Sequence, residues 1–165
     1  MIATPGASSG GSLRSGRLCY RRGEAARRLR TDTHMANDDK NSPCLFCREQ
    51  KIVLANPLAY VTRDSYPVTE GHTLVIPKRH VPSLFDLTME ERMALLELLD
   101  GARRDLDQRY RPDGYNIGIN DGVAAGQSIF HLHIHLMPRY KGDKADPRGG
   151  VRWILPEKAA YWARK

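Results

Sequence analysis

Three short segments in the first half of the chain mix apolar and polar residues and are rich in Val, Ile, Tyr and Thr. They cover residues 51–54, 59–63 and 72–76. Asn-Pro at 56–57 and a largely polar stretch at 65–71 separate them, and such sequences favour turns. The pattern predicts three strands joined by turns.

A helical pattern follows these strands. Thr88-Met-Glu-Glu91 is a capping box, in which the Thr88 hydroxyl can accept a hydrogen bond from the Glu91 backbone while the Glu91 side chain reaches back. We expect the helix to end near Tyr110, ahead of Pro112. Apolar residues recur at three- and four-residue steps and predict one buried stripe: Met89, Met93, Leu96, Leu99, Ala102 and Leu106.

Strand-like sequence resumes after the helix. Residues 115–120 and 130–137 flank a Gly-containing loop at 121–128, and we find no internal repeat. Strands interrupted by one long helix indicate an α+β fold. We expect an antiparallel sheet with one main helix and a short helix.

Residues 1–40 differ in composition from the rest of the chain. They are rich in Gly and Ser and then in Arg, with no sustained apolar run, so we expect a disordered basic extension. A transit peptide, a basic arm and an extension upstream of a start at Met35 all fit this sequence. Residues 41–165 are then expected to form one folded domain with a C-terminal tail.

The formal net charge of the 165-residue chain is +7, and it is unevenly distributed. Residues 1–34 contain seven Arg and two acidic residues, whereas residues 35–165 contain 19 basic and 17 acidic residues. The nearly balanced second part gives little reason to expect a nucleic-acid partner. No apolar stretch approaches the ~20 residues of a membrane-spanning helix, so we expect no membrane insertion.

The three cysteines are too few for a disulfide framework and suit a reducing compartment. We therefore expect a cytoplasmic protein, or a mitochondrial one if residues 1–34 are a transit peptide. Two cysteines form Cys44-Leu-Phe-Cys47, a spacing that fits a redox pair, a chance pair or half of a zinc site. The motif precedes the first expected strand, which argues against a thioredoxin-like pair.

The segment His131-Leu-His-Ile-His-Leu136 alternates histidine with an apolar residue. On a strand, the three histidines share one face, about 6.6 Å apart, while the apolar residues pack into the core. Three imidazoles on one face can bind a metal, hold a phosphate or supply a nucleophile. Five of the six histidines fall within residues 72–135, which argues against a coincidental histidine face.

The stretch 131–137 resembles the signature of the histidine-triad family, in which three histidines alternate with hydrophobic residues. The resemblance extends over about residues 42–140, because Gly126-Gln127-Ser128, Asn120 and the block 71–80 also match family motifs. Members of this family are nucleotide hydrolases and transferases. The resemblance thus implies a homodimeric enzyme that pairs its main helix and a strand across the interface.

The resemblance also implies roles for individual residues. His133 would attack the α-phosphorus of a nucleotide and form a covalent nucleotidyl-imidazole intermediate. His135 and His72 would face the phosphate oxygens, and Asn120 would steady the site near the nucleophile.

Four further residues match family positions for substrate contacts or for the leaving group. Gln127 and Ser128 would stand beside the leaving group, with Gly126 allowing close backbone approach. Asp64 would contact the ribose hydroxyls. The alternatives are an ordinary turn before a strand for residues 126–128 and a solvated loop acid for Asp64.

A subset of the family carries structural zinc on two Cys and two His. The matching residues here are Cys44, Cys47, His80 and His131. Thiolates and imidazoles in a closed tetrahedron are what structural zinc prefers. A metal-free thiol pair and a plain surface His80 remain the alternatives.

The residues after the triad point to a branch of the family. Pro138-Arg139 resembles the dinucleoside polyphosphate hydrolase branch more than the phosphoramidase branch. Basic and aromatic residues that can contact phosphates or a base, or else form a solvated surface, are Arg139, Lys141, Arg148, Arg152, Trp153 and Trp162.

We therefore expect a hydrolase of dinucleoside polyphosphates such as diadenosine tetraphosphate. Phosphoramidate hydrolysis and nucleotidyl transfer to phosphate are alternatives within the family. A nucleotide-binding adaptor and a metalloenzyme are alternatives of another class, although the triad segment offers no carboxylate for an open catalytic metal site.

Overall fold

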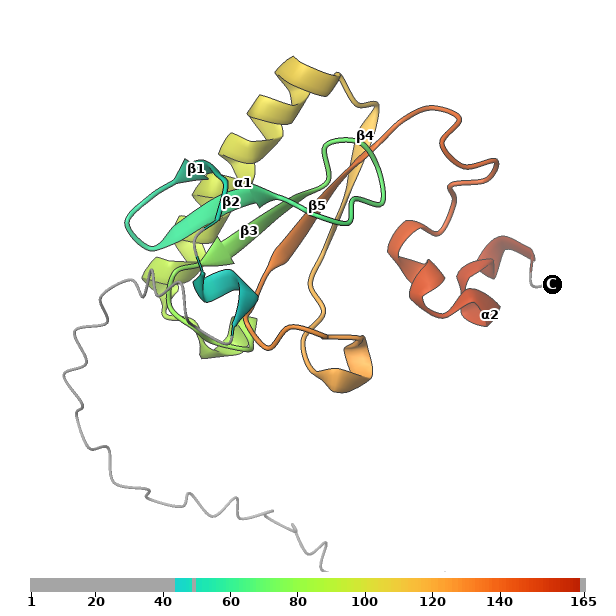
Figure 1. The fold of residues 1–165 in the computed structure, drawn as a ribbon. Coiled ribbons are helices and arrows are strands. Elements are labelled where there is room, and N and C mark those ends of the chain that lie inside the picture. The colour runs from blue at the N-terminus through green and yellow to red at the C-terminus, as the bar shows by residue number, and fades with distance from the viewer. Residues whose placement is uncertain (1–43, 49, 164–165) are drawn as a thin grey trace, which may run out of the picture. The chain divides into compact units, whose positions relative to one another are not determined.

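A computed structural model of the chain describes residues 44–48 and 50–163 (Figure 1). The expected basic extension at 1–40 lies outside these residues and stays a prediction. The strands and helices are β1 Ile52–Ala55, β2 Ala59–Arg63, β3 Thr73–Pro77, α1 Met89–Tyr110, β4 Gly114–Gly118, β5 Ile134–Arg139 and α2 Pro156–Ala159.

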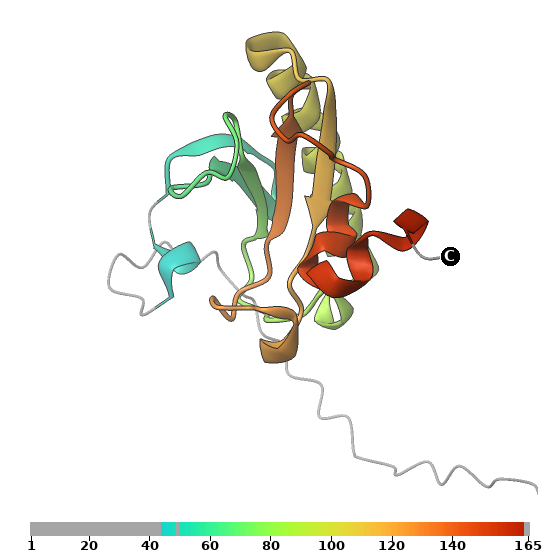
Figure 2. The ribbon, with the colours of Figure 1, turned by 90° about the vertical axis from the view of Figure 1, so that its right-hand side faces the viewer.

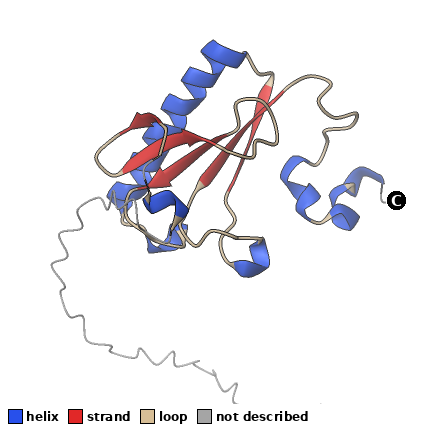
Figure 3. Ribbon diagram, in the orientation of Figure 1, coloured by secondary structure: helices blue, strands red, loops and turns tan. Residues whose placement is uncertain are grey.

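The five strands form one sheet in the order β1-β2-β3-β5-β4, and every neighbouring pair is antiparallel (Figure 3). The expected α+β fold, with an antiparallel sheet, one main helix and a short helix, is therefore confirmed. β5 lies between β3 and β4, so residues on β5 have neighbours on both sides. His135, for example, is opposite Leu74 of β3 and Gly118 of β4.

Helix α1 lies along one face of the sheet (Figures 1 and 2). Its predicted capping box is present, with Thr88 Oγ1 accepting from Glu91 N and a Glu91 carboxylate oxygen accepting from Thr88 N. The helix ends at Tyr110, where Arg111 takes a left-handed conformation at φ 48°. Among the described residues, no helix is long and apolar enough to span a membrane.

The predicted buried stripe of α1 is wrong in its first half. Met89, Met93 and Leu96 are 68%, 58% and 55% exposed. The buried row instead consists of Glu91, Leu95, Leu98, Ala102 and Leu106, which also recur at three- and four-residue steps. Glu91 obscured this row because a carboxylate is rarely buried unless it is paired, and its partner Arg79 lies outside the helix.

The histidine segment begins before the strand on which it was expected. β5 starts at Ile134, so His131 and His133 precede the regular ladder. The reason is that Leu132 N donates to Val81 O, in the loop after β3, rather than to a neighbouring strand. The predicted alternation nevertheless holds, because Leu132, Ile134 and Leu136 are all buried in the main core.

Candidate active site and metal centre

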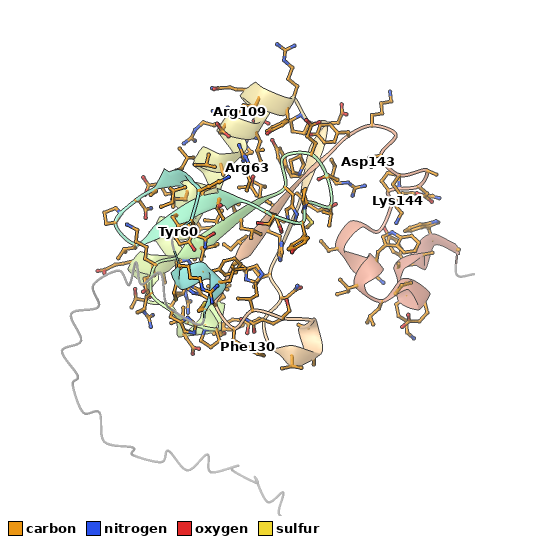
Figure 4. All side chains as sticks on the ribbon, viewed as in Figure 1. Tyr60, Arg63, Arg109, Phe130, Asp143 and Lys144 are labelled. Carbon is orange, nitrogen blue, oxygen red and sulfur yellow. The ribbon has the colours of Figure 1, made fainter. Side chains whose placement is uncertain are left out.

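Five histidines from three segments meet at one end of β5. His72 immediately precedes β3 and His80 follows it, whereas His131, His133 and His135 approach along and into β5. Phe130, beside the first triad histidine, and Asp143, after the strand, lie at opposite ends of β5 (Figure 4). The histidines separate into two groups with different surroundings.

The first group, which we call the Cys/His cluster, contains Cys44, Cys47, His80 and His131. Their potential ligand atoms all lie within 4.8 Å of one another. Cys47 Sγ lies 3.3 Å from His80 Nδ1, and both sulfurs lie 3.5 Å from His131 Nδ1. A tetrahedral zinc ion with Zn–S bonds of ~2.3 Å and Zn–N bonds of ~2.05 Å places sulfur and nitrogen about 3.6 Å apart. The cluster has the dimensions and donors of such a site.

His131 is held with one nitrogen turned toward the two sulfurs. Its Nε2–H donates to Pro77 O over 2.8 Å, which leaves the Nδ1 lone pair for a ligand. The side chain has no solvent exposure, and burial lowers its pKa to about 4. The neutral form that a metal requires is therefore the stable one.

Phe46 is a contributor to the site that the sequence analysis missed. It lies between the two cysteines, and its ring packs edge-on against His131 and His133, with centroids 5.9 and 5.0 Å apart. Its carbonyl accepts a hydrogen bond from the buried Tyr60 hydroxyl over 2.7 Å, which fixes the cysteine turn to β2. The only sequence signal was an apolar residue inside the Cys-x-x-Cys motif.

His133 lies between the two groups and is 8% exposed. Its Nδ1–H donates to the carbonyl oxygen of His131 over 2.9 Å. Because a carbonyl can only accept, Nδ1 carries the proton and Nε2 has a lone pair. This ring contacts His135 edge-on, with centroids 4.8 Å apart.

The second group contains Asp64, His72 and His135. His72 Nε2 lies 3.0 Å from His135 Nδ1, and the Asp64 carboxylate lies 3.3 Å from His72 Nδ1. Asp64 reaches this position because its backbone N–H pairs with His72 O across the β2–β3 hairpin. Asp64 thus lies beside a site histidine, and Oδ1 accepts from Tyr66 N within its own loop.

Both histidines of this group favour the neutral form. Burial lowers the pKa of His72, against the opposing effect of the Asp64 charge. Burial, together with the neighbouring His133 and His72, lowers the pKa of His135 to about 4. At neutral pH these rings act as hydrogen-bonding groups rather than as fixed positive charges.

The loop before the triad is held in place by Gln127. Its amide accepts from Gly122 N over 2.8 Å and donates to Pro82 O over 2.7 Å, and the side chain is buried. Gly126 has φ +86°, a conformation that strongly favours glycine. Ser128 is exposed, and Asn120 is half-buried after β4.

Arg139 lies at the far end of β5 from the histidines that open the segment. Its guanidinium forms two hydrogen bonds with Asp143 and one with Asn116, and the pKa of Asp143 falls to about 2 as a result. In the tail, Lys144 stacks on Trp153 and Arg148 stacks on Trp162. Lys141 and Arg152 are exposed. The structure does not bring these residues together with the histidines.

Comparisons with known proteins agree with this arrangement. The HIT domain family matches residues 47–142, more than half of the chain. A zinc-bound histidine triad protein from Mycobacterium smegmatis superposes with a TM-score of 0.58 at 35% identity, covering 63% of this chain and 80% of that one.

Two curated relatives carry names that describe an activity. The AP-4-A phosphorylase of Mycobacterium tuberculosis is 39% identical over 102 residues, which cover 61% of this chain and 52% of the relative. The bis(5'-adenosyl)-triphosphatase of Saccharomyces cerevisiae is 35% identical over 105 residues, covering 61% and 51%. The match therefore spans about half the length of each of these relatives.

Proposed function

Because this chain belongs to the HIT family, we propose that it cleaves dinucleoside polyphosphates such as diadenosine tetraphosphate at an α-phosphate. The observation that carries the proposal is the hydrogen bond from His133 Nδ1 to His131 O. It directs the lone pair of Nε2, the nitrogen that would attack phosphorus. The names of the two curated relatives support this substrate class.

In the first step, His133 Nε2 forms a bond to the α-phosphorus, and the bond to the bridging oxygen breaks. The leaving nucleotide departs with the electron pair of that bond. The nucleotidyl-imidazole carries a positive charge, which the acceptor His131 O stabilises through Nδ1–H. A water molecule then attacks phosphorus, releases a nucleoside monophosphate and a proton, and returns His133 to its neutral form.

The surrounding residues would bind and orient the phosphates. His72 and His135 lie beside His133 and supply N–H donors where negative charge builds. Ser128 would stand beside the leaving group, and Asn120 would steady the site near the nucleophile. Asp64 and Gly126 complete the proposed binding site, with Asp64 orienting His72 in addition to any ribose contact.

Two of the proposed substrate contacts involve side chains that already have hydrogen-bond partners in the structure. Gln127 Nε2 donates one N–H to Pro82 O, and its second N–H would be the donor to the leaving group. The Arg139 guanidinium uses three of its five N–H donors on Asp143 and Asn116, and the remaining donors would contact a second nucleotide.

We also propose that the Cys/His cluster holds a structural zinc ion. When bound, zinc would supply cross-linking rather than chemistry, since all four donors are protein side chains. The cluster would join the cysteine turn to His131, whose carbonyl is the acceptor for His133. Zinc would therefore act on the nucleophile through the backbone of His131.

A second candidate reaction transfers the nucleotidyl group to inorganic phosphate. Its support is the M. tuberculosis phosphorylase, which matches at 39% identity. The same covalent intermediate serves both reactions, because water and phosphate compete for the second step.

The test is a substrate panel: diadenosine tri- and tetraphosphate, an adenosine phosphoramidate and an adenosine phosphosulfate, each with and without phosphate. Asymmetric cleavage of a dinucleotide by water is expected, and phosphate dependence would establish the phosphorylase. Preference for the phosphoramidate would contradict the proposed substrate. Nucleotide binding without turnover of any substrate would favour the adaptor.

We further propose that two copies of the chain associate through α1 and β4. β4 is an edge strand of the sheet, and Met89, Met93 and Leu96 form an exposed apolar row on α1. Light scattering after size-exclusion chromatography should give twice the chain mass, and Met93→Glu should reduce it. The matched control Glu90→Gln, one turn away in the same helix, should remain dimeric.

A further inference from the structure

Asp64, His72 and His135 form a compact group separate from the Cys/His cluster. Their potential ligand atoms lie within 4.8 Å of one another. Two imidazole nitrogens, His72 Nε2 and His135 Nδ1, face each other at 3.0 Å, and Asp64 lies on the other side of the His72 ring.

We propose that His72 Nε2 and His135 Nδ1 form a second, exchangeable site for a divalent cation such as Zn²⁺, and that this cation blocks nucleotide cleavage. Imidazole nitrogens suit zinc and neighbouring transition metals. The binding part of the proposal stands on the geometry alone, whereas the inhibitory part rests on the proposed function.

The distance between the two nitrogens suits one bridging ion. With Zn–N bonds of about 2.05 Å, an ion spans a 3.0 Å separation at an N–Zn–N angle of about 94°. The partly exposed His135 ring would have to rotate for its lone pair to point at the ion, and this rotation would widen the angle. The proton now shared between the nitrogens moves through solvent to the other nitrogen of its own ring, so both imidazoles stay neutral.

Asp64 favours the tautomer that binds metal. Coordination through His72 Nε2 requires the proton on Nδ1. The Asp64 carboxylate, 3.3 Å from Nδ1, can accept this proton, and Val68 N, which donates to the same nitrogen over 3.4 Å, must then give up that hydrogen bond. A carboxylate behind a ligating histidine fixes the ring and strengthens its binding. Asp64 itself stays in place because Oδ1 accepts from Tyr66 N and its backbone pairs with His72.

The two metal sites should differ in occupancy. The Cys/His cluster offers four protein ligands, whereas His72 and His135 offer two and leave the remaining positions to water or phosphate. The second ion should therefore exchange readily. It would lie beside His133, whose ring is 4.8 Å from that of His135, where the α-phosphate must bind.

The binding test is calorimetric titration of Zn²⁺ into the full-length protein already holding one equivalent of zinc. A second, weaker equivalent is expected. His72→Gln and His135→Gln should weaken this second binding at least 10-fold while keeping the first equivalent. Asp64→Asn should weaken it about 10- to 100-fold, the range for loss of a carboxylate behind a metal ligand. No second equivalent, or unchanged binding by the variants, would overturn the proposal.

A control variant and a spectroscopic measurement complete the zinc-binding test. His34→Gln, which removes an imidazole outside the described residues, is the matched control and should bind as wild type does. If a site variant fails to fold, ¹⁵N signals of the wild-type imidazoles replace it. Zn²⁺ should then move the His72 Nε2 and His135 Nδ1 signals, and movement confined to other histidines would contradict the proposal.

The inhibition test measures diadenosine tetraphosphate cleavage at buffered free Zn²⁺. Activity should fall in proportion to occupancy of the second site and return when a weak chelator removes that ion. A second ion that binds without slowing turnover would refute the inhibitory part. A second ion on a protein that cleaves no substrate would refute the proposed function and leave the metal site standing.

Discussion

The short segment from His131 to His135 has a closed end and an open end. His131 is fully buried, with one nitrogen bound to Pro77 O and the other facing two sulfurs. His135 is partly exposed, and its ring contacts the imidazoles of His72 and His133. The same residue type, four positions apart, therefore lies in the Cys/His cluster at one end and beside His72 at the other. The neighbours, rather than the histidine itself, determine which role each ring can take.

His133 couples the two ends, and its replacement should have the largest effect. His133→Asn keeps a donor for His131 O but removes the nucleophile, so kcat should fall at least ~10⁴-fold. Zinc content should match that of wild type, because no member of the Cys/His cluster changes. Steady-state kinetics with metal analysis checks both. Residual activity within tenfold of wild type would show that His133 is not the nucleophile.

Removing a ligand from the Cys/His cluster should mainly lower the free energy of unfolding. Cys47→Ser should lose stoichiometric zinc and lower the free energy of unfolding by about 3–4 kcal/mol, since a structural metal contributes to folding directly. Denaturant unfolding with and without a chelator measures this change. Cys19→Ser, outside the described residues, is the matched control and should keep its zinc. A Cys47 variant that retained full zinc would contradict the ligand assignment.

The partly buried ion pair between Arg79 and Glu91 should have the next largest effect on stability. Glu91 accepts two hydrogen bonds from Arg79, the residue before His80, and these bonds lower the pKa of the Glu91 carboxyl. Glu91→Gln should reduce the free energy of unfolding by about 2 kcal/mol. Glu90→Gln, an exposed neighbour, should change it by less than about 0.5 kcal/mol.

This effect has a defined pH dependence. Because the pKa of Glu91 is lower in the folded than in the unfolded state, its contribution is complete above the ordinary pKa of about 4.3–4.5. It is lost as the pH falls through the lower, folded value. The difference between wild type and Glu91→Gln should therefore shrink in acid. A difference that grew below pH 4 would contradict the assignment.

A substitution in the group of Asp64, His72 and His135 that leaves the Cys/His cluster intact should have the smallest effect on activity and stability. Asp64→Asn removes the charge beside His72 but can keep the hydrogen bond from Tyr66 N, so kcat should fall about 10-fold. Zinc in the Cys/His cluster and the free energy of unfolding should stay close to wild type. Loss of that zinc would show that the two ends are not independent.

The sequence was most informative where local rules determine structure. The capping box at Thr88 and the bounds of β2 at 59–63 were predicted correctly, because both depend on neighbouring residues. The alternation of Leu132, Ile134 and Leu136 identified core positions before the strand bounds were known. The convergence of Cys44, Cys47, His80 and His131 came from the family resemblance, and the structure places them together.

The misses have long-range causes. The buried face of α1 depends on Arg79, which neutralises Glu91 from outside the helix. The late start of β5 depends on a bond between Leu132 and Val81. The contact between Asp64 and His72 follows from the register of the β2–β3 hairpin, which a single sequence does not display. Local patterns therefore predicted the helices and strands. Contacts between these elements determined how the histidines separate into the Cys/His cluster and the group with Asp64.

The most direct test of the different roles proposed for His131, His133 and His135 is to locate the covalent intermediate. The protein is mixed with diadenosine tetraphosphate labelled at the α-phosphorus, quenched in alkali within the first turnover, and digested for mass spectrometry. The expected result is a nucleotidyl group on His133 alone. A nucleotidyl group on His131 or His135, or turnover with no labelled histidine, would contradict the assignment of the closed and open ends.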